Sequence, residues 1–184
     1  ANKLMKGYIG TANIDTNSRL CMSSAVAGYK RAFGADIVPA SYEDFDTAEL
    51  IILVGSNTAW CHPIVFQRIK AIKEQRPSLK VVVIDPRETA TNEIADLHLP
   101  IKAGTDVLLF NALLVDVVTK GLTDEEFVSK HTKGLAETLK SAQQDVGDGS
   151  TVAERLGIDA EALETLKTWF ANTPKTMTLF SMGV

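Results

Sequence analysis

The sequence contains few cysteines, which limits the metal and redox sites that it can build. Its two cysteines are Cys21 and Cys61. Two thiols exclude an iron–sulfur cluster ligated by this chain alone, because such clusters normally take four thiolates. A disulfide framework is not expected for two cysteines in a chain of 184 residues. Cys61 is expected to be a small buried or loop thiol and not a catalytic one.

The sequence also lacks excess positive charge and any long hydrophobic run. With a net charge of −4, we expect neither a nucleic-acid nor an anionic membrane partner. The longest apolar run, around residues 50–54, is far too short to cross a bilayer. Apolar residues make up 45% of the chain, enough for one full core. The chain begins with Ala1 and starts and stops within structural patterns, so we expect a fragment of a larger protein.

Two apolar segments predict the centre of a parallel sheet. Leu50–Val54 and Val81–Ile84 each run into polar, turn-forming residues and then into helix. This layout is typical of an α/β fold that binds a nucleotide at the carboxyl ends of its strands. We predict a three-layer, Rossmann-like sandwich with these strands adjacent and parallel. Residues 1–120 and 174–184 are predicted to form the α/β domain, and residues 121–173 a helical insertion packed on it.

The polar segments after these strands are candidate nucleotide-binding residues. Gly55-Ser-Asn57 offers backbone N–H groups to a phosphate, although the same residues are common in an ordinary strand-to-helix cap. Asp85 suits two ribose hydroxyls, or caps the following segment. Asp106 matches the N1–H and N2–H donors of guanine, and is equally suited to cap a long helix. The G-x-G-x-x-G and G-x-x-x-x-G-K-[ST] fingerprints are absent, so the cradle is of another type.

These motifs resemble the molybdopterin oxidoreductases that carry a bis(molybdopterin guanine dinucleotide) cofactor. The resemblance is carried by Gly55-Ser-Asn57, His62-Pro63, Asp85-Pro-Arg87, Thr89, Ala95-Asp-Leu-His98 and Gly104-Thr-Asp106. The opening segments, residues 2–7 and 13–26, are similar to bacterial nitrate reductases, closest to the assimilatory branch. The similarity extends over essentially the whole chain.

The resemblance assigns a metal to Cys21. By residue type alone, a helix cysteine is usually a small, inert hydrophobe. A thiolate is nevertheless a soft ligand suited to a thiophilic metal. The pattern of Asn17, Arg19, Cys21 and Met22 matches the family segment whose cysteine ligates molybdenum. The resemblance therefore implies that Cys21 is the only direct protein ligand, that Asn17 contacts the pterin, and that Met22 lines the substrate approach.

The resemblance also implies a cofactor and partners. The cofactor is molybdenum bis(molybdopterin guanine dinucleotide), with an iron–sulfur cluster in the full-length protein but not in this chain. Nitrate is the implied substrate, an electron-donor protein or reductase subunit the partner, and the cytoplasm the location. The residues implied to bind the cofactor are Asn17, Val54, Gly55, Ser56, Asn57, Thr58, Ala59, Trp60, Cys61, Asp85, Pro86, Arg87, Glu88, Thr89, Gly104, Thr105, Asp106 and Met182.

Three functions stay open on the sequence. The leading one is the central cofactor-binding portion of a molybdenum-dependent nitrate reductase, inactive as an isolated fragment. The second is another member of the family, a periplasmic nitrate reductase or a formate dehydrogenase, although formate dehydrogenases usually have His where Met22 stands. The third is a nucleotide-binding module without redox chemistry, in which Cys21 is structural. Trp60 is expected to pack on the cofactor or to form a hydrophobic plug, and His62 and His98 to be structural or surface residues.

Overall fold

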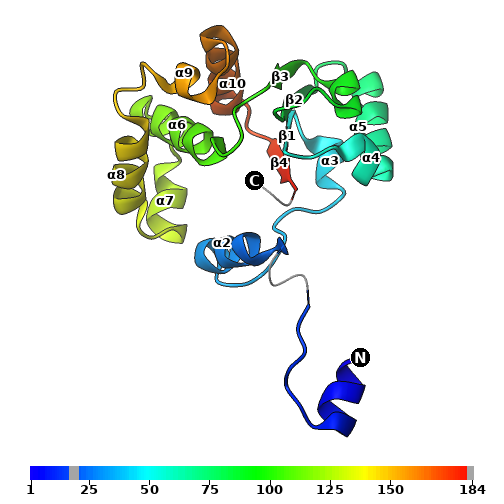
Figure 1. Cartoon of the computed structure of the whole chain (residues 1–184). Helices are drawn as coiled ribbons and strands as arrows, with labels where there is room; N and C mark the ends of the chain where they lie inside the picture. The colour runs from blue at the N-terminus through cyan, green and yellow to red at the C-terminus, as the bar shows by residue number, and fades with distance from the viewer. Residues whose placement is uncertain (17–20, 182–184) are drawn as a thin grey trace. The chain divides into compact units, whose positions relative to one another are not determined.

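The computed structural model describes residues 1–16 and 21–181, divided between two compact units, residues 1–39 and a larger unit that starts at Ala40 (Figure 1). The first unit contains the π-helix η1 (Lys3–Ile9) and the helix α2 (Ser23–Phe33). Helix α2 ends at Gly34, whose φ of 78° lies in the left-handed region that favours glycine. Gly34 is therefore well suited to end this helix.

The larger unit is built on a four-stranded sheet in the order β3-β2-β1-β4. The strands are β1 (Leu50–Val54), β2 (Lys80–Ile84), β3 (Leu97–Leu99) and β4 (Thr176–Phe180). Every neighbouring pair is parallel, and β1 lies beside β2 with Val54 opposite Ile84. All five residues of β1 are buried, which explains its continuous apolar run, because parallel sheets are covered on both faces. The predicted central strand pair is confirmed.

Helices cover both faces of the sheet, so the predicted three-layer sandwich is confirmed (Figure 1). One face packs against α3 (Asp44–Thr47), α4 (Thr58–Cys61), α5 (Pro63–Gln75) and the 3₁₀-helix η2 (Ala90–Ile94). The other packs against α6 (Asp106–Thr119), α8 (Leu135–Val146), α9 (Val152–Leu156) and α10 (Ala160–Asn172). Because successive strand side chains point to opposite faces, Ile51 and Leu53 join one core and Ile52 the other.

Two helices of the segment predicted as a helical insertion, α7 (Glu125–His131) and α10, begin with acidic caps. The short helix α7 follows Asp124, whose carboxylate accepts the N–H of Phe127 at 2.8 Å. Asp159 accepts the N–H of Glu161 at 3.1 Å in front of α10. These caps satisfy donors that have no partner within the helix. Helices α8, α9 and α10 share one core with the sheet and α6, and the predicted boundary at residue 121 stays a prediction.

None of the helices within residues 1–16 and 21–181 has the length and apolar character needed to cross a membrane.

Candidate functional site

The loops that follow β1 and β2 leave the sheet side by side. The N–H of Gly55 donates to the carbonyl of Ile84 at 2.8 Å, which continues the ladder one residue beyond β1. Gly55 has a φ of 54°, a left-handed conformation that favours glycine, and the chain turns there. The N–H of Asp85 donates to the carbonyl of Leu99 at the end of β3, at 3.3 Å. The segments beginning at Gly55 and Asp85 therefore start together at the carboxyl edge of the sheet.

Thr91 joins these two loops. Its hydroxyl donates to Oδ1 of Asn57 at 3.3 Å and accepts the N–H of Ala59 at 3.1 Å. Thr91 is fully buried, and Asn57 forms no side-chain cap of its own. The first turn of α4 is thus capped by a residue 32 positions further along the chain. Sequence reasoning missed Thr91, because no local pattern distinguishes it from any other threonine in a short helix.

Asp85 is buried and has one carboxylate oxygen to spare. The residue is only 6% exposed. Its Oδ1 accepts the N–H of Arg87 at 2.8 Å, so it caps the following turn, as one of the two sequence interpretations expects. Its backbone carbonyl accepts a hydrogen bond from Nε2 of His98 at 2.9 Å. No donor among the described residues reaches Oδ2, which leaves this atom free to accept from a ligand.

The remaining residues of both loops divide into exposed and engaged groups. Pro86, Arg87 and Glu88 are exposed. Thr89 is the N-cap of η2, and its hydroxyl accepts the N–H of Thr91 at 3.3 Å.

In the first loop, the buried hydroxyls of Ser56 and Thr58 bond to each other at 2.9 Å. Their side chains are therefore satisfied within the loop, which leaves the backbone as the part available to a phosphate.

Trp60 and Cys61 differ from two of the sequence expectations. Trp60 is 77% exposed, so the hydrophobic-plug interpretation is wrong. Cys61 is an exposed free thiol at the end of α4, so of the two expected settings, a buried or a loop thiol, the buried one is also wrong. Both follow from the shortness of α4, whose four residues cannot bury a complete face. His62 is exposed at the N-cap of α5, and Pro63 occupies the first turn, a position that suits proline.

The third predicted segment follows β3 and opens α6. Gly104 has a φ of 81°, and the hydroxyl of Thr105 donates to the carbonyl of Lys102 at 2.6 Å. The N-cap of α6 is Thr105, and Asp106 is the first helical residue. The prediction that Asp106 itself caps the helix is therefore wrong by one residue. No hydrogen bond or ion pair from a described residue reaches the Asp106 carboxylate, although the helix dipole favours a negative charge there.

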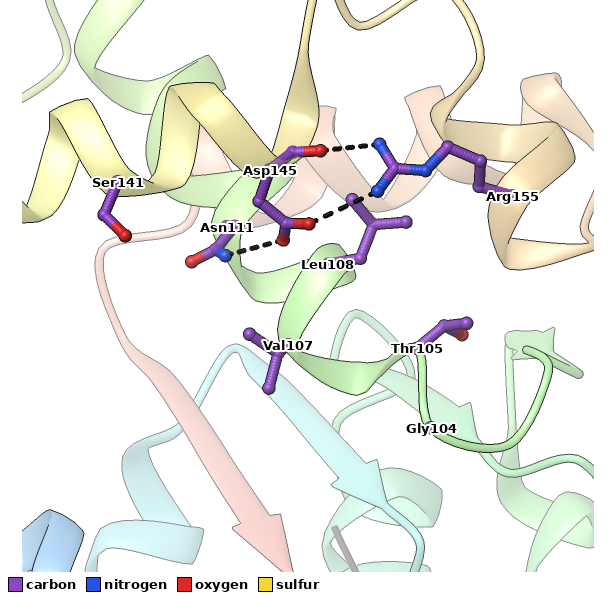
Figure 2. Close-up of a pocket in the computed structure, with 8 residues that line it drawn as sticks. All are labelled: Gly104, Thr105, Val107, Leu108, Asn111, Ser141, Asp145 and Arg155. Carbon is purple, nitrogen blue, oxygen red and sulfur yellow. Dashed lines mark hydrogen bonds and ion pairs between the residues drawn. The ribbon is translucent and has the colours of Figure 1, made fainter.

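A pocket of about 540 Å³ lies beside this segment (Figure 2). Asp145 on α8 lines it, and its carboxylate accepts from Nδ2 of Asn111 at 2.8 Å and from Nη2 of Arg155 at 3.3 Å. The lining residues are Gly104, Thr105, Val107, Leu108, Asn111, Ser141, Asp145 and Arg155. None of them belongs to residues 54–61 or 85–89. Of the residues predicted to bind the cofactor, Gly104 and Thr105 line this pocket.

The predicted metal ligand lies in the first unit. Cys21 is an exposed free thiol, so it is accessible to a metal ion. Met22 occupies the N-cap of α2 and is 40% exposed. Asn17 and Met182, also predicted to contact the cofactor, lie outside the described residues. Within the described residues, no three or more His, Cys, Asp or Glu side chains gather so that they could hold a metal ion.

Comparisons with known proteins give the family. The family model described as "Molybdopterin oxidoreductase" matches residues 1–184. A nitrate reductase from Klebsiella oxytoca is 48% identical over all of this chain and 20% of its own length. An assimilatory nitrate reductase from Haloferax mediterranei is 37% identical over 99% of this chain and 24% of its own. A periplasmic nitrate reductase from Desulfovibrio desulfuricans is 34% identical over all of this chain and 25% of its own.

A solved structure supports the same assignment. Acetylene hydratase from Pelobacter acetylenicus superposes with a TM-score of 0.77 and 26% identity, over 92% of this chain and 22% of that one. The chain spans 20% of the length of the Klebsiella relative that it matches. The family model covers the whole chain, and the fold is similar to that of this solved structure. The chain therefore belongs to the molybdopterin oxidoreductase family.

Proposed function

We propose that this chain is the central molybdopterin guanine dinucleotide-binding portion of a molybdenum-dependent nitrate reductase. The observation that carries the proposal is 48% identity to a nitrate reductase over the full length of the chain. Membership of the family implies a molybdenum–molybdopterin cofactor. When bound, this cofactor supplies oxygen-atom transfer, in which nitrate, two electrons and two protons give nitrite and water. The electrons would come from a donor protein or reductase subunit, through an iron–sulfur cluster outside this chain.

The described residues fit the nucleotide half of such a cofactor. Oδ2 of Asp85 is an acceptor that no described residue uses, and it suits a ribose hydroxyl. The carboxylate of Asp106 likewise has two acceptors to match the N1–H and N2–H donors of guanine. The backbone of Ser56 and Asn57 would face the pyrophosphate, because the Ser56 side chain is already engaged. Asp85 and Asp106 follow β2 and β3, neighbouring parallel strands of the sheet.

The metal end of the cofactor would be held by Cys21. Its thiol is exposed and free, and a thiolate is the protein ligand best suited to a soft metal. Met22, exposed beside it, would line the approach of nitrate.

A cytoplasmic, assimilatory setting is part of the same proposal. Relatives named assimilatory and periplasmic are both similar to this chain. Fractionation of the native cells, followed by detection of the full-length protein, decides between the two compartments. Recovery with the periplasmic fraction would overturn this part of the proposal and favour a periplasmic nitrate reductase.

Substitution of Cys21 in the full-length protein tests the proposed function. Cys21→Ser should lose molybdenum and lower nitrate reduction by about 100-fold or more, because a serine hydroxyl does not replace a soft thiolate ligand. Ser24→Ala, an exposed change in the first turn of α2, three residues after Cys21, is the matched control and should leave both unchanged. Metal content and activity with nitrate and with formate are measured side by side. A Cys21→Ser protein that keeps its molybdenum and reduces nitrate, or a wild-type protein that oxidises formate instead, contradicts the proposal.

A further inference from the structure

The ladder between β2 and β3 ends in an unusual way at Asp85. Val83 lies opposite His98 and Ile84 opposite Leu99. The N–H of Asp85 donates to the carbonyl of Leu99 at 3.3 Å. In a parallel ladder, the next bond would run from the N–H of residue 101 back to the carbonyl of Asp85. If β3 continued as a regular strand, the N–H of residue 101 would therefore donate to the carbonyl of Asp85.

The turn at Pro100 diverts that donor. The N–H of Ile101 instead donates to the carbonyl of Leu99 at 2.9 Å, across Pro100, which itself has no N–H. Nε2 of His98 takes the vacant place, at 2.9 Å from the carbonyl oxygen of Asp85. Since a carbonyl oxygen only accepts, Nε2 carries the proton and donates. A side chain of β3 thus completes the ladder that its backbone leaves unfinished.

Three polar groups of Asp85 are consequently held in place by hydrogen bonds to other residues. Its N–H is held by Leu99, its carbonyl by His98 and its Oδ1 by the N–H of Arg87. Fixing the carbonyl restricts rotation of the peptide that follows Asp85, and this rotation determines where Arg87 lies. The bond from Arg87 in turn orients the carboxylate, so that Oδ2 remains as the acceptor without a partner among the described residues.

We propose that His98 is a positioning residue for Asp85: its imidazole replaces the missing ladder donor and so holds the Asp85 carboxylate in the orientation that accepts a ribose hydroxyl of a bound guanosine. The identity of the ligand rests on the proposed function. The positioning itself rests only on the contacts of His98, Asp85 and Ile101.

The same ladder offers a matched control at its other end. There, Oδ2 of Asp96 accepts the N–H of Val81 at 2.7 Å, and Asp96 also pairs with Lys73. This side chain closes the amino end of the ladder, where no ligand-binding residue is proposed. Asp96→Ala should therefore lower stability without altering nucleotide content. It separates a general loss of stability from a loss of positioning.

The experiment uses three variants of the full-length protein, namely His98→Leu, His98→Gln and Asp96→Ala. Hydrogen–deuterium exchange of residues 85–89 reports the positioning, and the guanine nucleotide released by acid from each mole of protein reports the ligand. His98→Leu should speed exchange and lower nucleotide content, each about tenfold, because the carbonyl loses its donor and the carboxylate its orientation. His98→Gln, whose amide N–H₂ can still donate, should restore most of both.

Each outcome decides the proposal. If His98→Leu exchanges residues 85–89 as fast as the wild type and holds as much guanine nucleotide, the proposal is overturned. Equal losses in His98→Leu, His98→Gln and Asp96→Ala would also overturn it, because these would follow stability alone. A wild-type protein that holds no guanine nucleotide would contradict the proposed function. In that case, faster exchange in His98→Leu that is reversed in His98→Gln still supports the positioning of Asp85, and unchanged exchange refutes it.

Discussion

Replacing Thr91 by valine removes the hydroxyl that joins the loop after β1 to the loop after β2. Valine has nearly the same shape as threonine, so packing at this fully buried position is retained. The two bonds that are lost are the one to Oδ1 of Asn57 at 3.3 Å and the one from the N–H of Ala59 at 3.1 Å. Any effect of the change therefore reports those bonds.

The expected cost follows from the exposure of the two partners. A hydrogen bond contributes about 0.5–1.5 kcal/mol net, and an orphaned buried group costs more. Asn57 and Ala59 are half-buried, so water replaces part of what they lose. We expect Thr91→Val to lower the free energy of unfolding by about 1–2 kcal/mol. Thr91→Ser keeps both bonds and loses a methyl group, which costs about 1 kcal/mol by a different mechanism.

Amide exchange distinguishes these two mechanisms where global stability does not. In Thr91→Val, the peptide containing Ala59 should exchange about tenfold faster, which corresponds to about 1.4 kcal/mol of local opening. In Thr91→Ser it should exchange nearly as in the wild type. The central strand β2 serves as the internal reference for global unfolding. If Ala59 exchanges at the same rate in Thr91→Val as in the wild type, Thr91 does not cap α4.

Two further predictions concern local conformation and charge. Gly104→Ala should destabilise the protein by about 1 kcal/mol in urea titrations, because φ is +81° and a Cβ there meets open space, so only backbone strain contributes. The control Gly28→Ala lies in the helical interior of α2, where a Cβ also meets open space, and should instead stabilise the protein by a similar amount. Equal effects of the two substitutions would contradict the strain argument. The Ser150 hydroxyl and then its N–H hold the pKa of Asp148 below its ordinary value. The stability that this contributes is present above the unfolded pKa and is lost as the pH falls through the folded pKa. Ser150→Ala should raise the pKa of Asp148 in a carboxyl NMR titration, and an unchanged pKa would refute the assignment.

The local elements could be predicted from the sequence because their signals are local. The buried strand Leu50–Val54 is a continuous apolar run, Pro63 marks the first turn of α5, and Gly34 marks the end of α2. Each depends on the conformational preference of a few neighbouring residues. The error at Asp106, which is the first residue of α6 and not its cap, arises because Thr105 and Asp106 are both acceptable caps and only the turn from Lys102 selects between them.

The candidate site depended on the sequence for its residue types and on the tertiary structure for its contacts. The polar residues after each strand were visible as candidates, because parallel strands place their carboxyl ends at one edge. The contacts that order this edge were not visible in the sequence. Thr91 accepts from Ala59, 32 residues away, and His98 donates to Asp85, 13 residues away. Such bonds form only after the strand order and register are fixed, when a side chain from one segment meets a backbone group that another leaves unpaired. Local preference carries no information about which group that will be.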